Sequence, residues 1–197
     1  MSALQGAGLF AIALAVAIAA FLVAAGYNTV IGLRNRVDKS WANVEVVLRQ
    51  RHDQLPALVA AVRDVMAFEQ EVLEEVARQR ARWREEDAVP VQGAVSGETS
   101  RAVRSLFAVI ERYPEIRSAE NVLRLQAEIQ RLEEQIADRR ELYNDQVFRY
   151  NTAIATLPML VLTPVFGWKP RDFFEAGPEA ASPRDVAIHD GGSGSSA

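Results

Sequence analysis

The chain has 197 residues, of which 22 are Lys or Arg and 26 are Asp or Glu, so its formal net charge is −4. This mild acidity, without a basic stripe that contains aromatic residues, argues against a nucleic-acid partner. The sequence has no cysteine, which excludes disulfides, thiolate metal ligands and a cysteine nucleophile. Its length allows one domain in addition to a membrane anchor.

The N-terminal stretch is uncharged, because no Asp, Glu, Lys or Arg occurs before Arg34. Nine residues between positions 7 and 25 are Leu, Ile, Val or Phe. They favour bilayer insertion by about −3 to −5 kcal/mol, and the run is long enough to cross the hydrocarbon core. We therefore predict a transmembrane anchor over residues 1–26. A cleaved signal peptide is the alternative, although the basic segment that precedes such a peptide is missing.

The charges that flank this span predict its orientation. Arg34, Arg36 and Lys39 follow the span closely, and no cation precedes it. Positive residues favour the cytoplasmic side, so the N-terminus is expected outside and the rest of the chain inside. Alanines at positions 7, 11, 15 and 19 form a stripe on which another membrane helix could pack, although a general richness in alanine is the favoured explanation.

After the span, apolar residues recur at steps of three and four, which is the spacing of one helix face. Asp53 suits a helix cap and Pro56 suits a first helical turn, so a boundary is expected there. Pro and Gly predict a loop at 88–97, and Pro158 ends the last helix. The expected fold is all-α, a transmembrane helix that continues into an antiparallel four-helix bundle. The predicted bundle covers residues 27–157, with helices over 27–50, 54–86, 99–112 and 118–156.

Residues 158–176 are apolar and aromatic but are interrupted by prolines. Phe166, Trp168 and Lys169 combine aromatic rings with a cation, which suits a membrane surface, so this segment is predicted to be membrane-proximal. The alternative is that it covers an open end of the bundle core. The last part, residues 177–197, is rich in Pro, Ser and Gly and is predicted to be a disordered tail.

Several blocks of the sequence resemble the LemA family of bacterial membrane proteins. They are YNTVIGLRNRVDKSWANVEVVLRQRHDQLPALV, ERYPEIRSAENVLRLQ, RRELYNDQVFRYNTAIATLP and FGWKPRDFFE, which occur in this order between residues 27 and 175. The resemblance implies a bundle of long helices anchored in the bacterial cell membrane by a single span, with no established enzymatic activity. Val47 and Phe68 depart from the family pattern, which often has Gln and His at these positions.

The family signature falls on polar and aromatic residues that we take as candidates for interaction or structural roles. They are Arg34, Asn35, Arg36, Asp38, Trp41, Asn43, Arg51, His52, Asp53, Tyr143, Asn144, Tyr150 and Asn151. The signature also includes Pro56, Pro158, Gly167, Lys169 and Pro170.

These residues give little indication of catalytic or metal-binding chemistry. A di-metal site in a helical bundle needs Glu-x-x-His steps, and the residue three before His52 is Arg49. His52 and Asp53 are read as a helix end and a cap rather than as a proton-transfer pair. Trp41 is read as a core residue, and the two Tyr-Asn pairs as residues that fix helix register through buried hydrogen bonds.

The sequence thus predicts a membrane-anchored scaffold or interaction module, with no catalytic, cofactor-binding or metal-binding residues. Its expected partners are the membrane, further copies of itself or other membrane proteins, and neither a nucleic acid nor a small-molecule substrate is expected. A ligand-sensing or stress-sensing bundle that regulates a membrane partner is the alternative. That alternative needs a polar pocket between the helices, which the regular apolar stripes argue against.

Overall fold

The computed structural model describes residues 3–63, 65–66 and 68–175, and within them it contains helices and no strand. The all-α prediction is therefore confirmed. The helices are α1 (Ala3–Val62), α2 (Gln70–Arg82), α3 (Val89–Ile110), α4 (Pro114–Arg117), α5 (Glu120–Ala155) and α6 (Met159–Phe166). The predicted tail at 177–197 lies outside the described residues.

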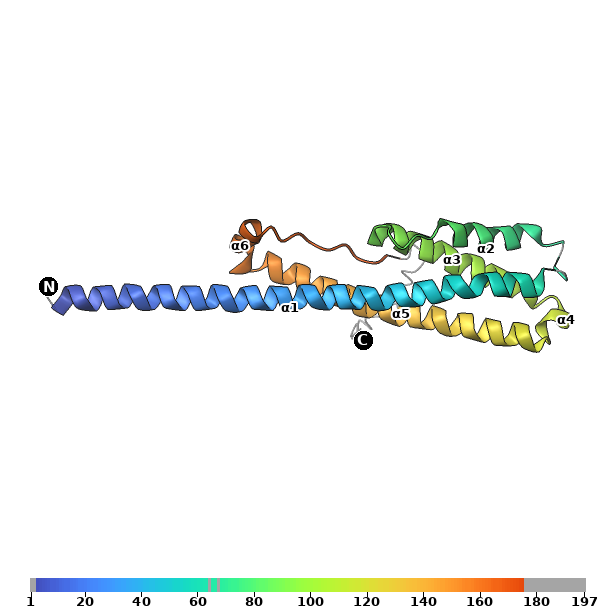
Figure 1. Cartoon of the computed structure of the whole chain (residues 1–197), viewed down its shortest axis with the longest axis horizontal. Coiled ribbons are helices and arrows are strands. Elements are labelled where there is room, and N and C mark those ends of the chain that lie inside the picture. The colour runs from blue at the N-terminus through green and yellow to red at the C-terminus, as the bar shows by residue number, and fades with distance from the viewer. Residues whose placement is uncertain (1–2, 64, 67, 176–197) are drawn as a thin grey trace, which may run out of the picture.

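Helices α1 and α5 form the frame of the molecule and share the most extensive helix–helix contact. Figure 1 shows α5 lying along the C-terminal half of α1, while the N-terminal half of α1 projects alone. The large apolar side chains of this part are exposed from Leu9 to Leu22, including Phe10 and Phe21. One helix therefore joins the apolar stretch to the bundle without a break.

The boundary predicted at Asp53 and Pro56 is wrong, because α1 continues through Pro56 to Val62. The apolar stripe also continues there through Leu55, Leu58, Val59 and Val62, which are at most 8 % exposed. Burying four such side chains contributes about 1.5–3 kcal/mol each, which outweighs the roughly 3 kcal/mol that a proline costs inside a helix. The chain turns only after Val62, and α2 begins at Gln70, so the helix predicted over 54–86 does not exist as one unit.

The loop predicted over 88–97 is also wrong, since α3 begins at Val89 and has Pro90 in its first turn. Proline fits that position because the first helical N–H groups have no partner inside the helix. Gly93, Ser96 and Gly97 are buried in α3. These small residues allow close approach of neighbouring groups, and they do not end the helix.

Two apolar clusters form the core, one at each end of the bundle. The distal cluster is the one farther from the projecting part of α1. It includes Leu58, Val76, Leu106 and Ile129, which come from α1, α2, α3 and α5. The proximal cluster includes Val37 of α1 and Val147 of α5, together with Met159, Trp168 and Phe174 from the chain after α5. Residues of α1 to α5 therefore contribute to the distal core, whereas an extended segment completes the proximal core.

The chain after α5 first forms α6 and then reverses direction. Gly167 ends α6 with φ +65°, a conformation that glycine adopts without steric cost, and Trp168 N–H donates to the carbonyl of Thr163 at 3.1 Å. Residues 168–175 then run extended toward the start of α3 (Figure 1). We call residues 168–175 the C-terminal strap.

Candidate interaction groove

Two asparagines of α5 hold the backbone of the C-terminal strap. Asn144 donates to the carbonyl of Phe174 at 3.2 Å and accepts from its N–H at 2.9 Å. Asn151 donates to the carbonyl of Arg171 at 2.9 Å and accepts from its N–H at 2.8 Å. Each amide therefore satisfies both backbone groups of one strap residue, as a neighbouring β-strand would.

The spacing of the two asparagines matches the spacing of the strap residues. Asn144 and Asn151 are seven residues apart, which is about 10.5 Å along a helix. Arg171 and Phe174 are three residues apart, which is about 10 Å along an extended chain. The Tyr-Asn repeat thus fixes the register of the strap against α5, whereas the sequence predicted that it fixes the register between helices.

Aromatic side chains pack around the distal end of the strap. The Phe174 side chain is 1 % exposed, and its ring centroid lies 5.8 Å from that of Trp41, which in turn lies 5.3 Å from Tyr143. The Tyr143 hydroxyl donates to the carbonyl of Asp172 at 2.9 Å. Burial raises the pKa of Tyr143 to about 12, and the charges of Asp172 and Asp38 act in the same direction. This hydroxyl is therefore a permanent hydrogen-bond donor to the strap near neutral pH.

The proximal end of the strap joins an aromatic cluster where the apolar stretch of α1 ends. Tyr27 lies 5.0 Å from Phe166 and 5.8 Å from Trp168 between ring centroids. Arg171 pairs with Asp38 of α1 at 2.9 Å. A cavity of about 400 Å³ opens beside the strap. Its lining includes Arg34, Tyr143, Tyr150, Phe166, Trp168 and Lys169, all of which the sequence predicted as site residues.

Trp168 is only 8 % exposed, because the strap covers the proximal core. This position supports the covering role that the sequence left open for residues after Pro158. The helix before it behaves differently, since Leu160, Val161 and Val165 of α6 are 51–75 % exposed.

A second group of predicted residues lies toward the distal end. The Arg51 guanidinium is fully buried and binds Glu133 and the Ser100 hydroxyl at 2.9 Å each and the Ser96 hydroxyl at 3.0 Å. Ser100 also donates to Glu133 at 2.6 Å. The sequence did not predict Ser96, Ser100 and Glu133, although the spacing of the two serines at i and i+4 on α3 was a signal.

His52 lies inside α1, ten residues before its last residue Val62, and not at a helix end. This position corrects the structural role predicted for the His52–Asp53 pair. Its ring stacks on Trp83, with centroids 4.6 Å apart and planes 18° apart. Neither ring nitrogen has a hydrogen-bond partner among the described residues. Burial lowers the pKa of His52 to about 3, with further lowering by the charges of Arg51 and Arg80. His52 is therefore a neutral core side chain.

Four predicted residues join neither group. Asn35, Arg36, Asn43 and Asp53 are exposed on α1. The backbone carbonyl of Asn43 accepts from Arg139 at 3.0 Å, which ties α1 to α5 without using the asparagine side chain.

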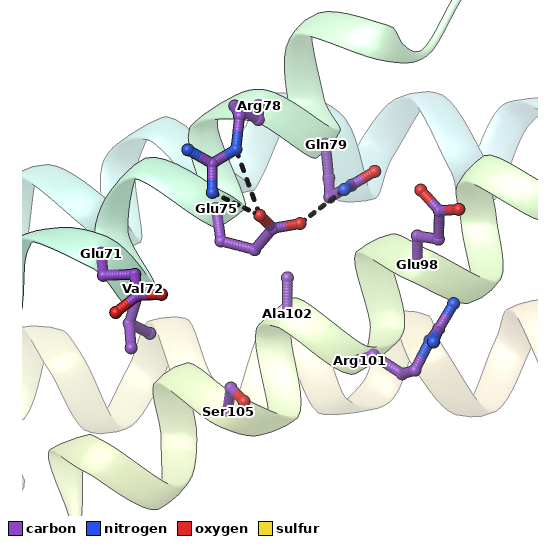
Figure 2. Close-up of a pocket in the computed structure, with 9 residues that line it drawn as sticks. All are labelled: Glu71, Val72, Glu75, Arg78, Gln79, Glu98, Arg101, Ala102 and Ser105. Carbon is purple, nitrogen blue, oxygen red and sulfur yellow. Dashed lines mark hydrogen bonds and ion pairs between the residues drawn. The ribbon is translucent and has the colours of Figure 1, made fainter.

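A hollow of about 450 Å³ lies between α2 and α3. Figure 2 shows that Glu75 of this hollow is already paired with Arg78 and Gln79. Glu75 accepts from Arg78 at 2.6 Å and from Gln79 at 2.5 Å. Glu98 pairs with Arg82. Exposed pairs of this kind contribute little free energy, so this hollow is a solvated face.

These elements define a class of protein, a helical bundle whose first helix extends far beyond it as an exposed apolar rod. The LemA family model matches residues 40–189, which is most of the chain. The chain belongs to the LemA family.

Curated relatives include the magnetosome proteins MamQ 1 and MamQ 2 of Paramagnetospirillum magneticum. Each is 24 % identical over 183 residues, covering 80 % of this chain and 67 % of the relative. The magnetosome protein MamQ of Magnetospirillum gryphiswaldense is 30 % identical over 87 residues, covering 44 % of this chain and 32 % of that protein.

Proposed function

We propose that this chain is a non-enzymatic scaffold or interaction module, anchored in the bacterial cell membrane by one span. The observation that carries the proposal is the continuity of α1, which runs as one helix from Ala3 to Val62. Its apolar window has a mean hydropathy of 2.7, and none of that window is buried within the chain. An exposed apolar surface of this size needs lipid or protein around it.

The aromatic cluster supports a membrane boundary near Gly26. Tyr27, Phe166 and Trp168 meet there, and tyrosine and tryptophan favour the headgroup level. The exposed apolar residues of α6 lie at the same level, because Met159 reaches Gly26. We propose that α6 rests on the bilayer surface while the strap turns back along the bundle.

The topology of this proposal has a direct test. A reporter fused after Glu175 should be active on the cytoplasmic side, with the N-terminus outside, because Arg34, Arg36 and Lys39 follow the span. Periplasmic activity of the reporter, or a mature protein that begins near Gly26, would overturn the proposed topology.

Self-association through the membrane helix has a separate test with a matched control. Replacing Ala11 and Ala15 with leucine adds bulk to the small-residue stripe and should weaken an oligomer formed there. The same change at Ala13 and Ala17, on the opposite face of the helix, should not. Crosslinking in native membranes measures the oligomer yield of both variants. Equal yields would mean that the copies associate through residues outside the membrane helix.

One observation favours the second candidate function, a ligand-sensing bundle that regulates a membrane partner. The buried polar cluster around Arg51, Ser96, Ser100 and Glu133 adjoins a cavity of about 360 Å³ between α3 and α5. Cavities of this size hold small molecules in other proteins. The regular apolar stripes of the sequence argued against such a pocket. A pattern of apolar residues does not reveal that two serines also lie on the inner face of α3.

A further inference from the structure

We infer that the cavity between α3 and α5 binds a phosphate group of a soluble molecule. This inference names a ligand class for the ligand-sensing function proposed above and does not depend on the scaffold function. The residues at the floor of the cavity and those at its rim each support this inference independently.

The floor consists of small and hydroxyl-bearing residues over a buried cation. Ser96, Gly97 and Ser100 of α3 and Ala137 of α5 line the cavity, and their short side chains leave it hollow. Arg51 lies beneath them with 0 % exposure and holds both serine hydroxyls. Its Nε has no partner among the described residues, so this buried guanidinium is incompletely satisfied.

The rim carries surplus positive charge. Arg101, Arg104 and Arg140 line the cavity together with Glu133 and Glu134. Glu133 is paired with Arg51 and accepts a hydrogen bond from the Ser100 hydroxyl, so its repulsion of an anion is reduced. Counting Arg51, four arginines meet two glutamates in a chain whose net charge is −4. A positive hollow on an acidic protein focuses anions.

Two of these arginines are available to a ligand. Arg104 and Arg140 make no ion pair or side-chain hydrogen bond with any part of the chain that the structure describes. Arg101 also borders the neighbouring hollow, where it lies beside Glu98 (Figure 2). One arginine from α3 and one from α5 therefore face the cavity from opposite sides, and the planar guanidinium fork suits phosphate oxygens.

The position along α1 favours a soluble source over a lipid headgroup. Arg51 lies 25 residues beyond Gly26, the end of the apolar stretch, which corresponds to about 38 Å along the helix. Headgroups at the end of the apolar stretch are therefore too far away to contact the cavity. Their charge is also screened there, because the Debye length is about 8 Å at physiological salt.

Inorganic pyrophosphate titrated calorimetrically into the full chain in zwitterionic nanodiscs tests the inference. We expect one saturable site with a Kd at or below about 1 mM that weakens with salt. Arg104→Ala and Arg140→Ala should each weaken binding about tenfold or more, and Glu134→Gln should strengthen it. Arg124→Ala, at an exposed position of α5 outside the cavity, should change nothing. Circular dichroism checks that each variant keeps its helices.

Absence of saturable binding, or binding that survives the Arg104→Ala and Arg140→Ala double substitution, would overturn the inference. An equal loss in Arg124→Ala would do the same, because it would indicate nonspecific attraction. Nanodiscs that contain phosphatidylglycerol separate the two phosphate sources: an unchanged affinity supports a soluble ligand, and competition by the lipid refutes it. Since the readout is ligand binding, its failure leaves the topology and self-association tests of the scaffold function unaffected.

Discussion

Asn144 pairs with both backbone groups of Phe174, donating at 3.2 Å and accepting at 2.9 Å. An amide side chain that hydrogen-bonds only to backbone groups can bind an extended segment whatever most of the side chains of that segment are. Sequence specificity then rests on the anchors, which are the buried Phe174 ring beside Trp41 and the Arg171–Asp38 ion pair. The C-terminal strap is thus held as a peptide would be held in a groove between α1 and α5.

Removing one amide should loosen the strap. Asn144→Ala leaves the N–H and carbonyl of Phe174 without their partner, which should lower the free energy of unfolding by about 1–3 kcal/mol. Asn35→Ala, at an exposed position of α1, is the control and should shift stability by less than about 0.5 kcal/mol. Denaturant unfolding measures both, and limited proteolysis should cut the strap first in Asn144→Ala. Equal stabilities would show that the amide contributes nothing.

The two phenylalanines near the end of the strap should respond very differently to truncation. Phe174 is 1 % exposed, whereas its neighbour Phe173 is 38 % exposed. Phe174→Ala should cost about 3–5 kcal/mol, because it leaves a cavity beside Trp41. Phe173→Ala should cost less than about 1 kcal/mol. Thermal unfolding compares them, and near-ultraviolet circular dichroism should change only for Phe174→Ala. A similar loss in both variants would contradict the docked position of the strap.

Glycines inside helices supply a second matched pair. A Cβ on Gly93 of α3 would lie 2.5 Å from the backbone oxygen of Glu175, so Gly93→Ala must displace the end of the strap. Overpacking of this kind costs about 1–3 kcal/mol. Gly32 of α1 has open space around it, so Gly32→Ala should gain about 0.5–1 kcal/mol of helix stability. Melting temperatures should move in opposite directions, and a stabilised Gly93→Ala would disprove the close approach.

Helix periodicity predicted the class of fold because an amphipathic stripe records burial directly. The boundaries were harder, since Pro56 is a local signal that the continuing stripe through Leu58 and Val62 overrides. The turn that does follow α1 contains neither Pro nor Gly, so it left no local mark. Gly93 and Gly97 were taken for a loop because close packing and flexibility select the same residue.

The residues of α5 that hold the C-terminal strap were partly predictable from the sequence. Tyr143, Asn144, Tyr150 and Asn151 stood out as a heptad-spaced repeat, but periodicity does not reveal that their partner is an extended segment. The buried polar cluster around Arg51 was harder to predict, because only Arg51 was expected there. Ser96, Ser100 and Glu133 come from helices whose pairing depends on the whole fold.

His52 gives the chain a predictable response to acid. Its pKa is about 3 in the folded chain against an ordinary value of 6.5, so between these pH values the unfolded chain binds the additional proton. Stability should therefore be complete above pH 6.5 and fall as the pH drops toward 3. The slope from this one group is at most about 1.4 kcal/mol per pH unit.

His52→Phe tests this response, because phenylalanine keeps an aromatic ring against Trp83 and cannot titrate. Neither nitrogen of His52 has a partner among the described residues, so the substitution leaves no newly unsatisfied group and should be neutral or stabilising at pH 7.5. Denaturant unfolding at pH 7.5 and pH 5 should then show a smaller acid-induced loss in His52→Phe than in the natural chain. Carboxylates titrate equally in both chains, so the difference between them isolates His52. An identical loss in both chains would mean that His52 accepts a proton while folded, which its buried position against Trp83 opposes.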